Sequence, residues 1–164
     1  MTAFSIIIPT YNQANLLYRC LKSVEQQTFK NYEVIIIDNY STDNTSKIVK
    51  KFSKKIKYFK FRNHGVIAKS RNLGIKKSKG KWICFLDSDD TWMAHKLQKL
   101  FTLQKQSFLD IICNAEWVFK GKNKKLWVYG PEKKNFYLKM ILKGNHFSTS
   151  GTSIKKSFLK KNKL

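Results

Sequence analysis

The stretch FSIIIPTYNQANLLYRCLKSVEQQTFKNYEVIIID, residues 4–38, contains two short apolar runs separated by a segment in which apolar residues recur every three or four positions. The runs have the length of strands, and the segment between them, residues 13–27, has the period of an amphipathic helix. A strand, a helix and a second strand in this order form a βαβ unit, whose strands are parallel. This stretch therefore predicts an α/β fold built on a parallel sheet.

Beyond residue 38 short apolar runs keep alternating with segments of helical period, so the sheet is expected to be mostly parallel and flanked by helices. Ser41 or Thr42 is expected to cap the second helix. Gly80 is expected to end the third helix, and the apolar run at residues 82–86 predicts a central strand. The further elements expected are a strand at residues 56–61, a helix at 65–78, a helix at 93–105, a strand at 110–114, a hairpin with its turn at 121–124, a helix at 135–142 and an extended segment at 148–154.

The length and composition fit one compact domain. The chain has 164 residues, of which 42% are hydrophobic, enough for one buried core. No run approaches the roughly 18 to 20 apolar residues that a membrane-spanning helix needs, and the N-terminus lacks the features of a secretory signal, so we expect the protein in the cytoplasm. Cys20, Cys84 and Cys113 are widely spaced without a C-x-x-C pattern, which favours small core residues over a disulfide framework or a zinc site.

The charge balance points to an anionic partner. The chain has 33 lysines and arginines against 10 acidic residues, which gives a formal net charge of +23. Nucleic acid, an anionic membrane surface and phosphorylated substrates are all consistent with this charge. The alternative is that lysine simply occupies solvated positions throughout the chain, and the charge alone does not separate these interpretations.

Polar clusters follow three of the predicted strands. PTYN (9–12) follows the first strand, DNYSTD (38–43) the second and DSDD (87–90) the fourth. Ligands of parallel α/β sheets bind beyond the carboxyl ends of the strands, because loops there carry polar groups on a rigid support. The first loop has no glycine, so it is neither a dinucleotide-binding G-x-G-x-x-G loop nor a P-loop. The sequence therefore predicts a ligand site at this edge in which other groups neutralise any bound phosphate.

Three carboxylates lie within four positions, at Asp87, Asp89 and Asp90. Two carboxylates about 4 Å apart repel by roughly 1 kcal/mol in water and by roughly 4 kcal/mol at the effective dielectric of a protein surface, so such a cluster favours a bound cation. Mg²⁺ and Mn²⁺ prefer oxygen ligands and often take only one or two carboxylates, with water and substrate phosphates as the other ligands. The alternative is an ordinary Asp-rich turn that caps the next helix.

Three blocks of the sequence together resemble one family. SIIIPTYNQANLLYRCLKSVEQQTFKNYEVIIIDN, STDNT and GVIAKSRNLGIKKSKGKWICFLDSDDTW, in this order and spacing, resemble the nucleotide-sugar-binding half of the family 2 inverting glycosyltransferases, which have the GT-A fold. The resemblance covers residues 4–100 and weakens towards residue 150. It implies a single GT-A domain over residues 1–164, with a nucleotide-sugar-binding half at 1–105 and a partial acceptor-side half at 106–164.

The resemblance also implies roles for individual residues in binding a UDP-sugar. Thr10 and Tyr11 would line the pocket for the base. Asp38 would accept a hydrogen bond from the base, commonly uracil, and Asn39 follows it in the same nucleotide-sugar-binding loop.

At the other end of the donor, Arg71 would reach the nucleotide from the third βα segment. Asp87 would lie near the ribose, with Ser88 beside it. Asp89 would bind a divalent metal, Mn²⁺ or Mg²⁺, that bridges the diphosphate, while Asp90 would shape the turn. A cation that offsets the growing charge of a diphosphate leaving group lowers the barrier to transfer.

Three positions depart from the family pattern. Tyr40 stands where the family usually has glycine, so the loop after Asp38 is expected to take a different path and to crowd the base. Ala94 replaces a usual proline. Inverting transfer needs a general base, and in the family this carboxylate follows a segment resembling FSTSGTSIKKSFLKK, where the present sequence ends. The acids after the DSDD cluster are Asp110, Glu116 and Glu132, and none of them is assigned as the base.

These features leave three interpretations open. The first is a metal-dependent glycosyltransferase that acts on a glycan or a lipid-linked saccharide. The second is a truncated donor-binding remnant, or a non-catalytic partner of a complete transferase. The third is a basic nucleic-acid-binding module, but the DSDD cluster at a central strand end would repel a phosphate backbone, so nucleic acid is not the expected partner.

The predicted hairpin and the residues after it mix lysines with the aromatic residues Trp127, Tyr129, Phe136 and Tyr137. A surface that docks on an anionic membrane has this composition, which favours peripheral attachment at the inner face of the cell membrane. The alternative is a solvated hairpin whose aromatic side chains enter the core.

Overall fold

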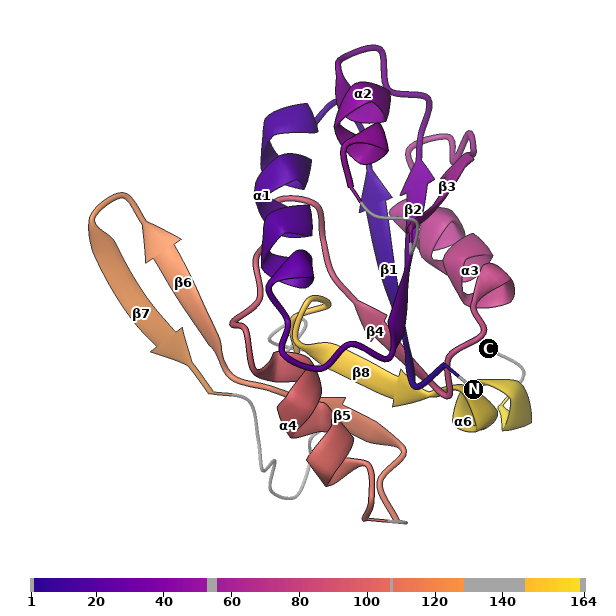
Figure 1. The fold of residues 1–164 in the computed structure, drawn as a ribbon, viewed down its shortest axis with the longest axis vertical. Coiled ribbons are helices and arrows are strands. Elements are labelled where there is room, and N and C mark those ends of the chain that lie inside the picture. Colours follow the sequence, from indigo (N-terminus) through magenta and orange to yellow (C-terminus); the bar gives the residue numbers. More distant parts are fainter. Residues whose placement is uncertain (1, 53–55, 107, 129–146, 163–164) are drawn as a thin grey trace, which may run out of the picture.

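The structure is a computed structural model of the chain, and it describes residues 2–52, 56–106, 108–128 and 147–162. Figure 1 shows a central sheet flanked by helices, with a separate hairpin that projects from it. The helix expected at residues 135–142 falls outside the described residues.

A six-stranded sheet forms the centre of the molecule. Its strands are β1 (Phe4–Thr10), β2 (Tyr32–Asp38), β3 (Ile56–Lys60), β4 (Trp82–Phe85), β5 (Ile111–Cys113) and β8 (Thr152–Lys155). The strand order is β3-β2-β1-β4-β8-β5. The first four strands are parallel, and β8 is antiparallel to both β4 and β5. The mostly parallel α/β sheet and the internal position of β4 are therefore confirmed.

Helices cover both faces of this sheet (Figure 1). They are α1 (Ala14–Glu25), α2 (Thr45–Lys50), α3 (Ile67–Lys77), α4 (Lys96–Leu103) and α6 (Lys156–Lys161). Apolar residues of α1, α2 and α4 pack in one core cluster, and those of α3 and α6 pack in the other. No helix in the described residues is long and apolar enough to cross a bilayer.

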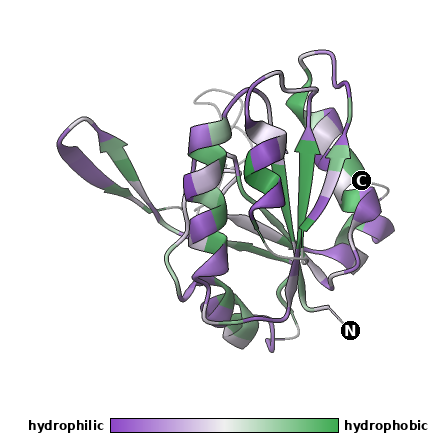
Figure 2. Ribbon diagram, turned by 45° about the horizontal axis from the view of Figure 1, so that its top comes forward, coloured by the Kyte–Doolittle hydropathy of each residue, from purple (hydrophilic) through white to green (hydrophobic). Residues whose placement is uncertain are grey.

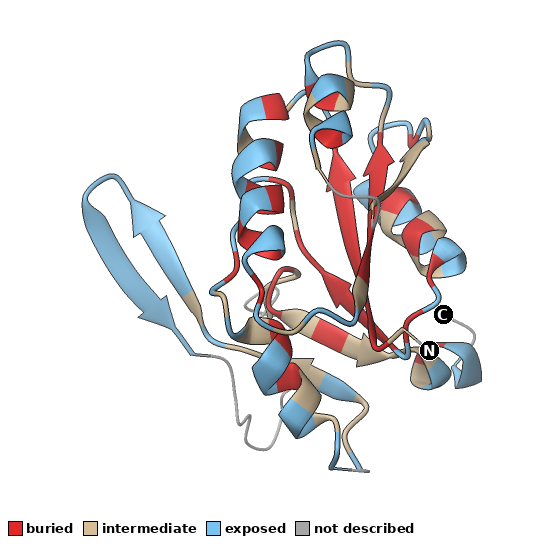
Figure 3. Ribbon diagram, viewed as in Figure 1, coloured by how far each residue is buried: buried red, intermediate tan, exposed pale blue. Residues whose placement is uncertain are grey.

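The central strands are apolar at successive positions because both of their faces are covered. Ile6 and Ile8 contribute to the cluster under α1, whereas Ile7 faces the cluster under α3. These strands are hydrophobic in Figure 2 and buried in Figure 3. On the second face α3 lies so close to β1 that a Cβ atom at Gly74 would stand 2.4 Å from Cγ2 of Ile7. Glycine is therefore needed there for close packing.

A two-stranded hairpin, β6 (Glu116–Lys120) and β7 (Asn123–Trp127), forms a separate sheet and projects from the body of the molecule (Figures 1 and 3). Residues 117–128 are all exposed. The described aromatic residues of the hairpin thus lie on the surface, not in the core. The turn consists of Gly121 and Lys122, shorter than expected, and Gly121 has a left-handed φ of 59°.

Two local predictions were wrong. Neither Ser41 nor Thr42 caps α2, which begins at Thr45 after Asn44; the Ser41 side chain binds Asp38 instead. Gly80 does not end α3 either, since the helix stops at Lys77. Gly80 is instead required by crowding, because a Cβ atom there would lie 2.5 Å from the backbone nitrogen of Ser5.

The three cysteines are free, as expected. Cys20 and Cys84 are buried in the core, whereas Cys113 is only partly buried. The interpretation as small core residues therefore fits the first two better than the third.

Candidate functional site

The loops after β1, β2 and β4 meet at the carboxyl edge of the sheet. Thr10 pairs with Asp38 in the register of β1 and β2, and the Asn39 amide donates to the Thr10 carbonyl at 2.9 Å. From the β4 loop, the Ser88 hydroxyl donates to Oε1 of Gln13 at 2.5 Å. The structure thus brings the three polar clusters identified in the sequence to one edge.

Asn12 and Asp43, which were not predicted as site residues, join the loop after β1 to the loop after β2. The amide of Asn12 donates to Oγ of Ser41 at 2.9 Å, and Oδ1 of Asn12 accepts from the amide of Thr42 at 2.8 Å. Oδ2 of Asp43 accepts from the amide of Ala14 at 2.9 Å, at the start of α1. Asn12 and Asp43 belong to the quoted PTYN and STDNT blocks, so their polarity was visible but their mutual contacts were not.

Backbone strain collects at the same edge. Asn12, Tyr40 and His64 have positive φ angles of 49°, 57° and 54°, and they lie in the loops after β1, β2 and β3. A left-handed conformation costs a non-glycine residue roughly 1–2 kcal/mol. Tyr40 therefore adopts, at a cost, the backbone region that glycine favours. Its ring lies 5.2 Å from the guanidinium carbon of Arg62, and the crowding of a base by Tyr40 stays a prediction.

Asp38 is fully buried and held by its own chain. Oδ1 accepts from the amide of Ser41 at 2.9 Å and from its hydroxyl at 2.5 Å, while Oδ2 accepts from the hydroxyl of Tyr58. Burial and the bond to Asp38 raise the pKa of Tyr58 well above its ordinary value, so Tyr58 remains a donor. A base that binds Asp38 would share Oδ2 with Tyr58 or displace it.

Two buried polar atoms at this edge have no hydrogen-bond partner among the residues that the structure describes. They are the hydroxyl oxygen of Thr10, a residue that is 5% exposed, and Nε of Arg71. An unsatisfied buried polar group costs about 1–3 kcal/mol, and a bound polar ligand would remove that cost. Tyr11, next to Thr10, is 55% exposed and is free to contact such a ligand.

Arg71 and Asp87 form the strongest charged contact of the site. Nη2 of Arg71, on α3, lies 2.6 Å from Oδ1 of Asp87, after β4. The two side chains are 19% and 30% exposed, so the pair is partly shielded from water. Two residues 16 positions apart, both predicted at the nucleotide, are therefore in direct contact.

The acidic cluster forms a turn closed by the Asp90 amide, which donates to the Asp87 carbonyl at 3.1 Å. The turn does not cap the next helix, because α4 begins later, at Lys96. Partial enclosure of the Asp90 carboxyl group raises its pKa, and so do the nearby charges of Asp89 and Asp87, although a hydrogen bond from Ser150 opposes this. Asp89 itself is exposed, and its carboxylate has no bonding partner in the described part of the chain.

The donor set suits a hard divalent cation that takes one or two carboxylates. Within residues 2–52, 56–106, 108–128 and 147–162, no three His, Cys, Asp or Glu side chains gather as a complete metal cage. Mg²⁺ and Mn²⁺ do not require one, since water and substrate phosphates commonly supply most of their ligands. Asp89, exposed and without a partner, fits such a site, and the unsatisfied groups of Thr10 and Arg71 fit a polar ligand beside it.

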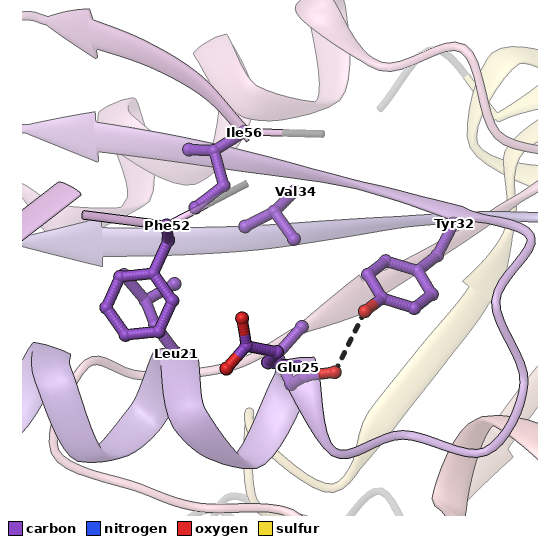
Figure 4. Close-up of a pocket in the computed structure, with 7 residues that line it drawn as sticks. Leu21, Glu25, Tyr32, Val34, Phe52 and Ile56 are labelled. Carbon is purple, nitrogen blue, oxygen red and sulfur yellow. Dashed lines mark hydrogen bonds between the residues drawn. The ribbon is translucent and has the colours of Figure 1, made fainter. Parts of the chain in front are cut away.

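A small pocket lies elsewhere, between α1 and the amino-terminal part of β2 (Figure 4). Its volume is about 30 Å³, and apolar side chains such as Leu21, Val34 and Ile56 line it. In Figure 4 the Tyr32 hydroxyl donates to the Val24 carbonyl at its rim, at 2.9 Å. This volume admits about one or two water molecules and no nucleotide, so the pocket is not the ligand site.

A family model for glycosyl transferase family 2 matches residues 5–161, nearly the whole chain. The chain belongs to glycosyl transferase family 2. The resemblance inferred from the three sequence blocks, which include the loops at the carboxyl edge, is therefore confirmed.

Individual relatives agree with this assignment. The chain is 34% identical over 171 aligned residues to the poly(ribitol-phosphate) beta-N-acetylglucosaminyltransferase TarP of Staphylococcus aureus, an alignment that covers 100% of this chain and 52% of TarP. It is 45% identical over 108 residues to an uncharacterized glycosyltransferase of Rickettsia bellii, covering 64% of this chain and 16% of that protein. The chain thus spans about half, or less, of the length of these curated relatives.

The fold also matches a solved structure. The crystal structure of S. aureus TarS residues 1–349 in complex with UDP-GlcNAc superposes with a TM-score of 0.83 at 26% identity, covering 99% of this chain and 48% of that one. The GT-A fold predicted from the sequence is therefore confirmed for this family member.

Proposed function

We propose that this chain binds a UDP-sugar and transfers its sugar, with inversion and with the help of Mn²⁺ or Mg²⁺, to a saccharide or lipid-linked acceptor. One observation carries the proposal: Arg71 and Asp87 are joined at 2.6 Å beside Asp89, whose carboxylate has no partner among the described residues, at the carboxyl edge of a family 2 domain. The structure of TarS in complex with UDP-GlcNAc supports a uridine nucleotide as the donor.

Different residues at the carboxyl edge would bind different parts of the UDP-sugar. The loop of Thr10 and Tyr11 faces the base, with Asp38 and Asn39 fixing its edge. Arg71 holds Asp87 in place for the ribose, and Ser88 is tied back to Gln13 so that its backbone cannot swing away. These residues are all on strand ends or short loops, which gives the donor a rigid platform.

Asp89 would hold the cation, with the diphosphate and water as the remaining ligands. When bound, the cation neutralises charge that builds on the diphosphate as the bond to the sugar breaks. The Arg71 guanidinium binds Oδ1 of Asp87 and so fixes the orientation of that carboxylate. The orphan Nε of Arg71 is a further donor for a phosphate or ribose oxygen.

The general base stays unassigned. Asp110 lies 3.6 Å from the Lys155 ammonium, at the opposite edge of the sheet from the loops of β1 and β2. Glu116 begins the hairpin and is close enough to Asp90 for its charge to raise the pKa of that carboxyl. Neither position identifies the group that would deprotonate an acceptor hydroxyl.

The decisive experiment is a calorimetric titration of UDP into the purified chain with and without Mn²⁺. We expect Mn²⁺ to strengthen UDP binding in the wild type and to have no such effect in Asp89→Ala. Asp110→Ala removes an acid outside the site and is expected to behave as the wild type. Metal-independent binding, or an equal response in Asp89→Ala, would refute the donor site, and UDP release from a UDP-sugar would then test turnover separately.

The acceptor is proposed to be an anionic or lipid-linked glycan. TarP acts on poly(ribitol-phosphate), and a Campylobacter jejuni relative, 31% identical over 119 residues, acts on a saccharide carried by PP-undecaprenol. A net charge of +23 suits either acceptor, since both carry phosphate.

We also propose that the β6–β7 hairpin contacts the anionic surface of the cell membrane from its inner face. Trp117, Phe119 and Leu126 are exposed on it, and four lysines surround them. Apolar rings insert at the interface while lysines meet anionic headgroups. We expect the chain to sediment with vesicles that contain phosphatidylglycerol and not with phosphatidylcholine alone, and a Trp117→Ser, Phe119→Ser variant to lose this binding. Phe108→Ser, at another exposed ring, is the control.

A further inference from the structure

Ser150, which lies far from the acidic turn in the sequence, is bonded to the first residue of that turn. The Asp87 amide donates to Oγ of Ser150 at 3.0 Å. Ser150 is only 4% exposed, so water does not compete for this bond. One hydroxyl therefore fixes the backbone at the start of the turn that carries Asp89, and the Asp90 amide closes that turn on the Asp87 carbonyl.

The backbone of Ser150 is fixed from the other direction. Its carbonyl accepts from Nε1 of Trp92 at 3.1 Å and from Nζ of Lys96 at 2.9 Å. Nζ of Lys96 also donates to Oδ1 of Asn114 at 2.5 Å, at the end of β5, and lies 4.4 Å from the centre of the Trp92 ring. Lys96 is largely buried, so its bonds join α4, β5 and the segment before β8 into one support.

The other side of the turn is held by α1. Ser88 donates to Gln13, and the amide of Trp92 donates to Oγ of Ser23 at 3.1 Å. The turn is thus clamped between an early helix and a late segment, residues 147–151. This second support was missed in the sequence because serine in STSGTSI has no pattern that links it to DSDD.

We propose that Ser150 is a positioning residue for the donor site, which holds the Asp87 backbone so that the turn presents Asp89 to the cation. Lys96 completes the clamp by fixing the Ser150 carbonyl. Residues outside a metal's own ligands commonly control its affinity by orienting those ligands. The inference rests on the proposed cation at Asp89 and extends it to a segment that follows the hairpin in the chain.

The test compares Ser150→Ala with Ser78→Ala. Ser78 is also buried, and its hydroxyl also bonds to the backbone, donating to the Ile75 carbonyl at 2.6 Å, but at the far end of α3. We expect Ser150→Ala to weaken Mn²⁺-dependent UDP binding about tenfold, which is more than it weakens metal-free UDP binding. Ser78→Ala is expected to change neither, and Ser150→Thr, which keeps the hydroxyl, to restore most of the loss.

Amide hydrogen exchange supplies a readout that needs no ligand. The Asp87 amide is expected to be protected in the wild type and to exchange faster in Ser150→Ala, but not in Ser78→Ala. An unprotected Asp87 amide in the wild type, or equal exchange in both variants, would overturn the clamp. If the wild type shows no metal-dependent UDP binding while exchange behaves as expected, the proposed function fails and the clamp stands as a structural support. Equal loss of Mn²⁺-dependent binding in both serine variants would refute the positioning role.

Discussion

The parallel sheet and the β6–β7 hairpin are built from similar residues but differ in what surrounds them. In β1 and β2 apolar side chains are buried from both faces, and the polar loops beyond them are held by hydrogen bonds between distant segments. In the hairpin, tryptophan, phenylalanine and leucine side chains are exposed, and each strand pairs only with the other. The first arrangement gives a rigid platform, and the second gives a surface with no cover in the described residues.

The difference also separates the two functions proposed for the molecule. A donor site needs groups fixed to within a fraction of an ångström, and such precision comes from packed strands and buried bonds. A docking surface needs exposed apolar area and charge, and a hairpin that packs on little else supplies both. The sheet should therefore govern stability and donor binding, and the hairpin should govern neither.

The largest contrast is expected for matched leucine truncations. Leu17, on α1, is fully buried, whereas Leu126, on β7, is 44% exposed. Leu17→Ala should lower the free energy of unfolding by about 2–5 kcal/mol, because it leaves a cavity in the core. Leu126→Ala should change it by less than about 0.5 kcal/mol. Urea denaturation followed by circular dichroism measures both, and a comparable loss in the two variants would show that the hairpin is part of the core.

A smaller effect is expected at the ion pair of the site. Arg71→Met keeps most of the side-chain length but leaves the partly buried Asp87 carboxylate without its partner. The free energy of unfolding should fall by about 1–3 kcal/mol, and UDP binding should weaken with it. Lys76→Met, on an exposed position of the same helix, is the matched control. If Arg71→Met is as stable as Lys76→Met, the contact at 2.6 Å contributes nothing and Arg71 does not position Asp87.

The buried Lys96 should make the free energy of unfolding depend on pH, by an amount similar to or smaller than the loss expected for Arg71→Met. Burial lowers its pKa from 10.5 to about 8, although Cys84, Glu116, Cys113 and Asp90 nearby oppose the shift. Between these values the unfolded chain binds more protons than the folded one, so stability should rise with pH from about 8. Over pH 8 to 9 the gain is on the order of 1 kcal/mol.

The measurement is confined to pH 8 to 9 because at higher pH the buried thiols lower the stability of the fold. Burial raises the pKa of Cys84 from 9.0 to about 11, and that of Cys20 further still, so the folded state loses stability above pH 9. Thermal unfolding of the wild type and Lys96→Met at pH 8 and 9 isolates the lysine. If the stability of Lys96→Met rises by the same amount between pH 8 and 9, a group other than Lys96 causes the rise.

The sequence predicted those parts of the fold that depend on local pattern. The successive isoleucines of residues 6–8 predict a strand covered on both faces, and the DSDD cluster directly after an apolar run predicts a loop at the edge. The insertion of β8 between β4 and β5 was not predicted, because a strand that returns from residue 152 is specified by packing rather than by its own composition. The clamp by Ser150 was missed for the same reason.

Within the site, contacts between individual side chains were harder to predict than the edge of the sheet at which their loops lie. The sequence placed Arg71 and Asp87 near the nucleotide, but nothing in their spacing indicated that they bind one another. Tyr40 was expected to divert its loop because it replaces a usual glycine, yet it takes the left-handed φ that glycine favours. The cap of α2 was wrong because the helix begins later, at Thr45, and the Ser41 hydroxyl oxygen accepts from the Asn12 amide rather than from a helix amide.

The smallest predicted effect is confined to the hairpin itself. Nζ of Lys124 lies 4.0 Å from the centre of the Trp117 ring, a cation–π contact that is worth about 0.5 kcal/mol at an exposed site. Lys124→Gln should therefore speed amide exchange in β6 and β7 by about twofold without changing the global free energy of unfolding. Lys125 pairs with Val118 and lies on the other face of the hairpin. Lys125→Gln is therefore the control and should have no such effect. Equally faster amide exchange in both variants would mean that lysine charge, and not the ring contact, stabilises the hairpin. A loss of global stability in Lys124→Gln would show that the hairpin and the sheet unfold as one unit.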